Sequence, residues 1–441
     1  MWMSLCAQEY QIYVESFLAI VLLYSACLIF HLLLPGKTVQ GYCCDTVTLK
    51  PLSYKLNGFS VLIVSIIIYY TILPLTSDET PTYFYDFYWT CLFWANQIGF
   101  MFSIFFFFYG GKEKYPIRCI TVDQIQIQSN NNSSELRDPE AIKKNNQLPE
   151  STTSNKVTSS LQCFYAGYLW NPRVSIFHQI VDIKMTLYVL GAIGLEYNLL
   201  SCISASINST KDDNHLSNAL VAYGLCFQWF ILDYMWHEEV HLYTYDLFAE
   251  KVGFKLGWGC LVFYPFFYPI GAYSIVDSDN DISIGTMIGI FVLFGCGWIM
   301  TRGANMQKFA YRKHMLQHKS NTVSSSSKVP PPSKFVFLGV LKCTQETIPG
   351  TSILCSGWWG QARHLNYAGE ILQSIALSIP GYLVGNNWIK KILPWLYPLY
   401  YVLLFITRQQ MDDYICEKKY GSLQWNTYKE RVSYRIFPGV Y

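Results

Sequence analysis

Long apolar runs are the feature that most constrains how this chain can fold. Each run is long enough to cross about 30 Å of hydrocarbon as a helix. A backbone in lipid must satisfy its own hydrogen bonds, and a helix does so within one segment. The sequence therefore predicts an all-α polytopic membrane protein with about nine or ten transmembrane helices. We place nine spans near residues 16–35, 58–77, 88–109, 184–205, 217–236, 253–276, 283–300, 369–386 and 390–407.

The charge composition is typical of a protein that is solvated by lipid. Only 14% of the residues are charged and 51% are hydrophobic, whereas soluble domains carry about 25% charged residues. Aromatic residues make up 17% of the chain, and Trp and Tyr settle at membrane interfaces. The net charge of +2 is too small to favour nucleic acid as a partner. The composition instead predicts contact with membrane lipid.

The distribution of charge between the loops predicts the orientation in the membrane. Acidic loops alternate with basic loops, and basic loops stay in the cytosol. The N-terminus should then be lumenal. The predicted cytosolic segments are 110–183, 237–252, 301–350 and the C-terminal tail.

A basic cluster directly follows the span that ends near Met300. The stretch TRGANMQKFAYRK contains four polar residues spaced by three, three and four positions: Arg302, Asn305, Lys308 and Arg312. This spacing places them on one face of a helix. Such a face can hold a multiply charged anion, although a basic flank that stops membrane transfer has the same composition.

Two further polar clusters lie at the predicted cytosolic ends of spans. In SGWWGQARHLNYAGE, two adjacent Trp offer a flat surface beside one polar helical face: Arg363, Asn366, Tyr367 and Glu370. In RQQMDDYICEKKYG, residues four apart again share a face: Arg408, Asp412 and Cys416. An interfacial aromatic belt and a solvated helix are the plainer interpretations. Ionisable groups at membrane depth nevertheless indicate a functional site.

A fourth stretch, HEEVH at residues 237–241, matches the HExxH signature of zinc proteases. In that signature His237 and His241 would bind the metal, and Glu238 would be the general base. A zinc protease also needs a third ligand and an open water position, and no recognisable second motif supplies the ligand. We predict no metal site and keep an intramembrane zinc protease as the more distant alternative.

At these clusters the sequence resembles the sterol reductase family of the endoplasmic reticulum. The stretches that carry the resemblance are RGANMQK, GWWGQARHLNY, DDYICEKKYG and the closing YRIFPGVY. The similarity runs from about Leu34 to Tyr441 and is strongest after residue 230. The family includes the Δ14-sterol reductases, with the C-terminal domain of the lamin B receptor, the Δ7-sterol reductases (7-dehydrocholesterol reductase) and the fungal Δ24(28)-reductases.

The resemblance implies a multi-pass protein of the endoplasmic reticulum membrane that reduces a carbon–carbon double bond of a sterol with NADPH. The sterol substrate would arrive from the bilayer, and a general acid would protonate its alkene. A non-catalytic sterol-binding protein of the same fold is a further alternative. Positions that match the family's motifs imply these cofactor contacts: Lys308, Arg312, Leu354, Trp359, Asn366, Tyr367, Asp412, Cys416 and Tyr428.

The general acid must be a neutral group in a dry cavity, where burial raises the pKa of a carboxyl. We favour Asp412 with Tyr367 in relay, and keep Glu238 as a further catalytic candidate. The Trp-His-Glu-Glu stretch resembles Δ14 enzymes, whereas GWGCLV and the PGVY ending resemble Δ7 enzymes. Met411 and Asp413 depart from the family pattern, and these departures make it harder to assign which double bond is reduced. The predicted reaction is Δ14 reduction, with Δ7 reduction as the alternative.

These expectations divide the chain into four parts. N-terminal transmembrane helices occupy residues 1–120, and a disordered polar insert occupies 121–160. Central transmembrane helices follow at 161–300. The region 301–441 is the predicted NADPH-binding and catalytic part, with a cofactor pocket that faces the cytosol.

Overall fold

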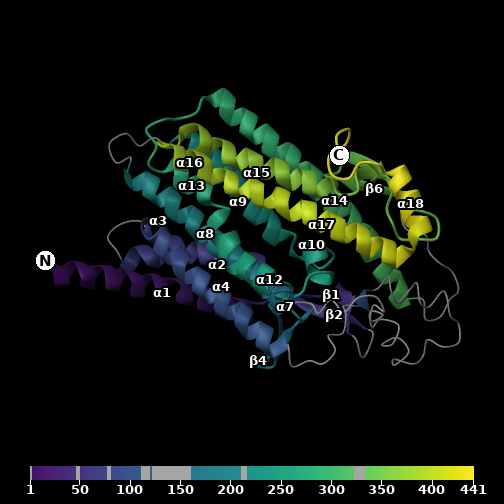
Figure 1. Cartoon of the computed structure of the whole chain (residues 1–441), viewed down its shortest axis with the longest axis horizontal. Helices are drawn as coiled ribbons and strands as arrows, with labels where there is room; N and C mark the ends of the chain where they lie inside the picture. The colour runs from purple at the N-terminus through teal and green to yellow at the C-terminus, as the bar shows by residue number, and fades with distance from the viewer. Residues whose placement is uncertain are drawn as a thin grey trace.

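The computed structural model describes residues 2–45, 50–76, 81–110, 120–121, 160–209, 216–321 and 333–441. The predicted polar insert at 121–160 lies outside the described residues, apart from its two ends. The chain is mostly helical (Figure 1). The principal helices are α1 (Trp2–Leu33), α2 (Gly58–Thr71), α4 (Tyr88–Gly110), α8 (Ile183–Ser209), α9 (Asn218–Trp236), α14 (Ile284–Asn321), α15 (Leu365–Val384), α17 (Leu396–Tyr420) and α18 (Ser422–Arg431).

Shorter helical segments connect these helices. The α-helical ones are α3 (Tyr83–Asp86), α7 (Ser160–Ala166), α10 (Glu238–His241), α11 (Tyr245–Phe248), α12 (Phe254–Trp258), α13 (Ile270–Ile275) and α16 (Trp388–Ile392). A π-helix, η2, spans Gly259–Phe267. Three 3₁₀ turns complete the set: η1 (Leu73–Thr76), η3 (Gly357–Gly360) and η4 (Leu393–Trp395).

Within the described residues, six helices are long and apolar enough to cross a membrane: Tyr10–Leu33, Tyr88–Gly110, Ile183–Ser209, Asn218–Trp236, Ile284–Leu316 and Trp388–Tyr420. The other three predicted spans are also helical, but each differs from a simple span. The helix Gly58–Thr71 has only 14 residues. The 253–276 run divides into α12, η2 and α13 around Pro265 and Pro269. The helix α15 carries polar side chains such as Gln373.

The mostly helical structure agrees with the predicted fold class, but the chain is not purely α-helical, because short antiparallel strands also pair outside the long helices. The first sheet has the order β2 (Pro51–Leu56), β1 (Lys37–Cys44), β3 (Ile120–Thr121). Two hairpins follow: β4 (Arg173–Ile176) with β5 (Gln179–Asp182), and β6 (Lys334–Phe337) with β7 (Leu341–Thr344). In the β4–β5 turn, Phe177 and His178 both have positive φ, as a two-residue hairpin turn with the right-handed strand twist requires.

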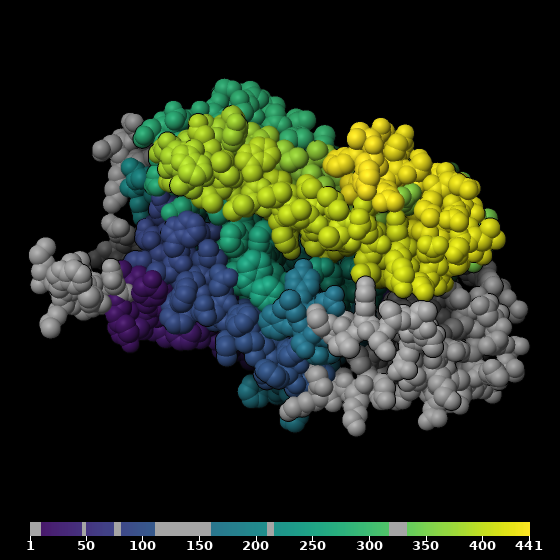
Figure 2. Space-filling view, in the orientation of Figure 1, coloured from purple at the N-terminus to yellow at the C-terminus, as the bar shows by residue number. Residues whose placement is uncertain are grey.

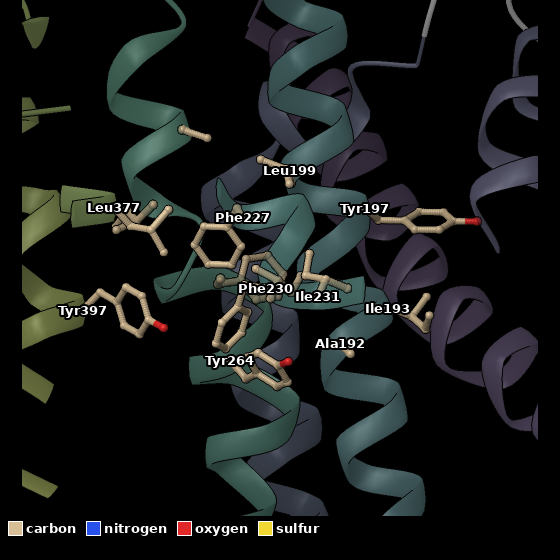
Figure 3. Close-up of a cluster of buried hydrophobic side chains, with 14 of the residues drawn as sticks. Ala192, Ile193, Tyr197, Leu199, Phe227, Phe230, Ile231, Tyr264, Leu377 and Tyr397 are labelled. Atoms are coloured by element: carbon tan, nitrogen blue, oxygen red, sulfur yellow. The ribbon is translucent and has the colours of Figure 1, made fainter. Parts of the chain in front are cut away.

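The helices share one continuous apolar core. In Figure 3, Phe227 and Phe230 of α9 face Tyr264 of η2 on one side, and Tyr397 of α17 lies across from them. The helix α8 is buried along most of its length. The buried cluster extends from Ile20 near the N-terminus to Ile436 near the C-terminus. The predicted N-terminal, central and C-terminal groups of helices therefore pack as one body.

The C-terminal half positions the polar clusters. Helices α14, α15 and α17 lie side by side, with α15 in contact with both of the others (Figure 1). Gly297 allows α14 to approach α15 closely, because a Cβ there would lie 2.7 Å from the carbonyl oxygen of Gly369. Small residues permit such close approach of membrane helices. In the space-filling view, α17 and α18 cover one end of the molecule (Figure 2).

Candidate functional site

A cavity of about 370 Å³ lies among α9, α14, α15 and α17, and residues of the 237–250 segment, η2 and the η3 turn also line it. All nine predicted cofactor contacts line it: Lys308, Arg312, Leu354, Trp359, Asn366, Tyr367, Asp412, Cys416 and Tyr428. Arg302, Asn305, Glu370 and Arg408 line it as well. Three helices that are separated in sequence therefore bring the three predicted polar faces to one place.

The cavity is elongated and differs chemically between its ends. On α17 the lining residues recur every three or four positions from Tyr401 to Lys419, a distance of about 27 Å at 1.5 Å per residue. Near Tyr401 the walls are aromatic, with Tyr264 of η2 and Tyr268, which directly follows η2, among the lining residues. Near Lys419 the walls include the cationic side chains of Lys308 and Arg312. One end thus suits an apolar ring system and the other suits an anion.

The basic face of α14 contains residues with different partners. Arg302 binds the carboxylate of Asp233 on α9. Arg312 donates to the carbonyl oxygen of Tyr243 at 3.0 Å. Lys308 lies 4.9 Å from the Trp359 ring, and no carboxylate of the described part of the chain forms an ion pair with it. Arg302 is therefore a structural residue of this face, and Lys308 is the cation best placed for an anionic ligand.

The Trp-Trp turn is held in place by a buried amide. Gln307 of α14 is fully buried and accepts from the backbone N–H of Trp358 at 3.0 Å. Its Nε2 donates to the carbonyl oxygens of Thr344 and Ser356, both at 3.2 Å. The indole Nε1 of Trp359 donates to the carbonyl oxygen of Ala304 at 2.8 Å. Gln307 was not singled out by the sequence, although it lies in the quoted RGANMQK stretch.

We expect Gly357→Ala to destabilise this turn. Gly357 has φ +65°, and an added Cβ would lie 2.6 Å from Nε2 of Gln307 and 2.7 Å from Sγ of Cys343. Strain and clash together should cost about 1–3 kcal/mol. The measurement is the apparent melting temperature in detergent. Gly350→Ala is the matched control, since Gly350 has φ +76° with nothing within 4 Å of an added Cβ; an equal loss in both proteins would contradict the packing role of the turn.

The start of α15 brings a phenol and a carboxylate together. The hydroxyl of Tyr367 donates to Oδ2 of Asp412 at 3.2 Å. The Tyr367 ring is sandwiched between His364, at 4.9 Å, and Phe405, at 4.2 Å between ring centroids. Burial, and then the nearby Lys308 cation, lower the pKa of His364 to about 3. His364 is therefore neutral, and its ring packs against Tyr367 without an ionic contact to Asp412, whose Oδ2 is 3.7 Å from Nδ1.

Two ionisable residues that the sequence did not indicate as site residues lie at the cavity: Asp246 lines it, and Lys184 binds the backbone of the segment that contains Asp246. Asp246 accepts from Arg408 at 2.5 Å, which places the Arg408 side chain beside the Asp412 position. Lys184 of α8 is fully buried and donates to the carbonyl oxygens of Leu247, at 2.9 Å, and Asp246, at 3.0 Å. A Lys inside an apolar run is a signal that could have identified it.

The HEEVH stretch lies on a bend and not on a continuous helix. His237 has φ −95° and ψ 31°, which ends α9 and starts α10. Nδ1 of His237 lies 3.1 Å from Oδ1 of Asp233, and Nε2 of His241 lies 3.1 Å from the carbonyl oxygen of Tyr234. The two His therefore have separate partners. Within the described residues, no group of three or more His, Cys, Asp or Glu side chains is placed to hold a metal ion.

Glu238 does not line the cavity. Its Oε2 accepts from the backbone N–H of Gly58 at 2.9 Å, at the start of α2. A carboxylate at this position satisfies a helix N-terminus. Burial raises the pKa of Glu238 to about 7, although the hydrogen bond from Gly58 opposes that shift. The structure thus places this catalytic candidate between two helices, away from Tyr367 and Asp412.

We expect the HEEVH stretch to act without a metal. Purified protein should contain far less than one zinc per chain by elemental analysis, because its His side chains have separate partners. Glu238→Gln should keep the apparent melting temperature of the parent chain, since the amide oxygen can still accept from Gly58. One zinc per chain would contradict this account.

The model of the ergosterol biosynthesis ERG4/ERG24 family matches residues 136–441. A Delta(14)-sterol reductase of Arabidopsis thaliana is 29% identical over 66% of this chain and 71% of its own length. A probable 7-dehydrocholesterol reductase of Acanthamoeba polyphaga mimivirus is 29% identical over 66% of this chain and 58% of its own. The Delta(14)-sterol reductase ERG24B of Gibberella zeae is 26% identical over 95% and 83%.

Proposed function

The chain belongs to the ERG4/ERG24 family of sterol reductases, and from this membership we propose that it reduces the Δ14 double bond of a sterol intermediate with NADPH. The observation that carries the proposal is the single cavity that collects Lys308, Trp359 and Asn366 at one end and aromatic side chains at the other. A reductase of this kind needs a cofactor and an apolar substrate to meet at one point. Tyr367 and Asp412 occupy the place where the two ends meet.

The cofactor end offers groups that fit a nicotinamide nucleotide. Lys308 and Arg312 would bind its phosphates, and the Trp359 ring would pack against one of its flat rings. Oδ1 of Asn366 is buried without a hydrogen-bond partner in the described part of the chain, so an amide or hydroxyl donor of the ligand would satisfy it. Leu354, Cys416 and Tyr428 would complete the wall. When bound, NADPH supplies the hydride.

Asp412 and Tyr367 are the proposed proton donors. Reduction of the Δ14 double bond needs a proton on one carbon and a hydride on the other. Tyr367 holds a proton at its hydroxyl oxygen, and this hydroxyl is hydrogen-bonded to Asp412. After Tyr367 has given its proton to the sterol, Asp412 can return one to the Tyr367 oxygen. Protonation at C15 would leave the positive charge on the tertiary carbon C14. Nearby aromatic faces would stabilise this cation. Glu238 is not kept as a donor, because it lies outside the cavity.

A Δ7-sterol reductase activity is the second candidate. It rests on the mimivirus relative, which bears the name of a 7-dehydrocholesterol reductase, and on the Δ7-like GWGCLV and PGVY stretches. The Δ14 proposal is favoured because the plant and fungal relatives bear that name. We further propose that the chain is a multi-pass protein of the endoplasmic reticulum with nine or ten spans and a cytosolic cofactor pocket. The loop charges support that orientation.

The experiment that tests the function is conversion of a defined diene. Microsomes that express the chain are incubated with NADPH and either a Δ8,14-diene or a Δ5,7-diene sterol, and products are identified by mass spectrometry. Reduction of the Δ8,14-diene alone supports the main proposal. Reduction of the Δ5,7-diene alone replaces it with the second candidate. Reduction of neither substrate would remove the enzyme proposal.

A further inference from the structure

One carboxyl group in the cavity has no part in the proposed mechanism. Glu370 of α15 lines the cavity, and its Oε2 is buried without a hydrogen-bond partner among the described residues. The nearby cation of Arg302 binds Asp233 instead. A buried acceptor without a partner is costly, so the position of this oxygen is explained if a ligand binds it.

The hydroxyl of Tyr264 in η2 is a second polar group of this kind. Tyr264 lines the cavity, and its hydroxyl oxygen is buried without a hydrogen-bond partner in the described part of the chain. Its phenol interacts electrostatically with the Glu370 carboxyl. A carboxyl oxygen can accept a hydrogen bond, and a phenol can donate one. The two side chains together therefore suit a ligand hydroxyl group, which donates one hydrogen bond and accepts another.

Aromatic rings surround the Tyr264 side of this pair. The rings of Tyr234 and Tyr268 pack against Tyr264, at 6.1 Å and 4.9 Å between centroids, and both residues line the cavity. Phe230, another lining residue, stacks on Tyr234. The pair thus offers a polar position next to walls of aromatic rings. A ligand that fits it carries a hydroxyl group on an apolar ring system.

Glu370 lies one helical turn from the proposed proton donors. It follows Tyr367 by three positions on α15, which separates the two Cβ atoms by about 5–6 Å. The neighbouring helix α17 shows the direction of this step. Phe405 stacks on Tyr367, and Tyr401, one turn nearer the aromatic end, lies beside the Glu370 carboxyl. A rigid molecule can therefore contact Glu370 with one end while another part of it lies at Tyr367.

We propose that Glu370 and Tyr264 bind the 3-hydroxyl group of the sterol substrate, with the carboxyl accepting from it and the phenol donating to it. This inference rests on the proposed reductase function, which makes the ligand a sterol. A sterol carries this hydroxyl at the opposite end of the ring system from C14 and C15. Because the fused rings are rigid, the contact at C3 determines which double bond lies at Tyr367. A water molecule would satisfy the same two side chains, and the experiments separate the two occupants.

Three variants separate hydrogen bonding by Glu370 from a structural role. Glu370→Leu removes both carboxyl oxygens and keeps an apolar side chain in the cavity wall. Glu370→Gln keeps an oxygen that can accept from a hydroxyl group. Gln373→Leu is the matched control, because Gln373 lines the cavity one turn further along α15 but already donates to Oγ1 of Thr301 at 3.1 Å.

The first test measures sterol binding without turnover. A tritiated Δ8,14-diene sterol is bound to the detergent-solubilised protein without NADPH, and either the same unlabelled sterol or its 3-deoxy analogue competes with it. For the parent chain we expect the analogue to bind about 10–100-fold more weakly, the range expected when a buried carboxyl is left without its partner. Glu370→Leu should remove this preference, whereas Glu370→Gln and Gln373→Leu should keep most of it. An equal preference in the parent chain and Glu370→Leu, as expected if water is the occupant, would overturn the inference.

The second test compares turnover of the two sterols with NADPH. Glu370→Leu should lower kcat/KM for the 3-hydroxy sterol by about the same factor as its binding, and it should leave kcat/KM for the 3-deoxy analogue close to that of the parent chain. Loss of kcat/KM by one common factor for both sterols would indicate a structural role and would overturn the inference. A parent chain that binds the sterols with the expected preference but reduces neither would instead remove the proposed function and leave the hydroxyl site in place.

Discussion

Asp412→Asn should reduce sterol about 10²–10⁴-fold more slowly, the range expected when a general acid is removed, and should still bind NADPH, because Asn keeps a side-chain oxygen at this predicted cofactor contact. Asn has the shape of Asp, but its amide cannot serve as the acid that gives a proton to the sterol or to the Tyr367 oxygen. Tyr367 would keep its place, because its ring is stacked between His364 and Phe405. The measurements are kcat for sterol reduction and the Kd of NADPH from nicotinamide fluorescence.

The neighbouring carboxylate provides the control for this prediction. Asp413 faces Arg363 and Arg435, each at 3.9 Å, and does not line the cavity. Asp413→Asn should therefore retain most of the turnover. Tyr367→Phe should share the loss seen with Asp412→Asn, because it removes the hydroxyl that donates to Asp412 and so removes the other member of the proposed proton relay. Full activity in Asp412→Asn would exclude Asp412 as the proton donor.

Lys308→Met should weaken NADPH binding by about 10–100-fold, because a charge-assisted contact to a phosphate is worth about 1.5–3 kcal/mol. Met keeps the length of the apolar stem that lies near the Trp359 ring, so the loss reports on the charge. Raised ionic strength should weaken binding to the parent chain more than to the variant, since salt screens the interaction with the phosphates. The measurement is the Kd of NADPH at two salt concentrations.

Lys313→Met is the matched control on the same helix. Lys313 pairs with Glu239 at 2.6 Å and lies outside the cavity. It should therefore leave the Kd of NADPH unchanged, together with its salt dependence. Equal weakening in both variants would show that α14 acts only through its general positive charge, and it would contradict the assignment of Lys308 to a phosphate.

Residue spacing predicted which side chains share a helical face better than it predicted the partners of each residue. The three- and four-residue intervals on α14, α15 and α17 placed the polar faces correctly, because helical periodicity is a local property. Spacing within one helix does not show which residues of the neighbouring helices lie opposite a given side chain. Arg302 therefore looked equivalent to Lys308, although Asp233 of α9 binds it. Likewise, the sequence around Glu238 does not reveal its hydrogen bond from Gly58, 180 residues earlier.

The small strands and the broken helix were harder to predict for a different reason. The β4–β5 hairpin turns at Phe177 and His178, where the usual Asn-Gly signal is absent. The apolar run at 253–276 is continuous in composition, and only its two prolines indicated that the helix would change form. Hydropathy shows which segments are apolar, but it does not show where tertiary contacts bend a helix formed by such a segment.

The most direct test of the central claim follows isotopes into the product. Purified protein is given a Δ8,14-diene sterol with NADPH that carries deuterium at both C4 positions, and in a second reaction ordinary NADPH in D₂O. If Tyr367 and Asp412 deliver a solvent proton and the cofactor delivers a hydride, the first product should carry deuterium at C14 and the second at C15. Absence of cofactor deuterium from the reduced sterol would contradict the account.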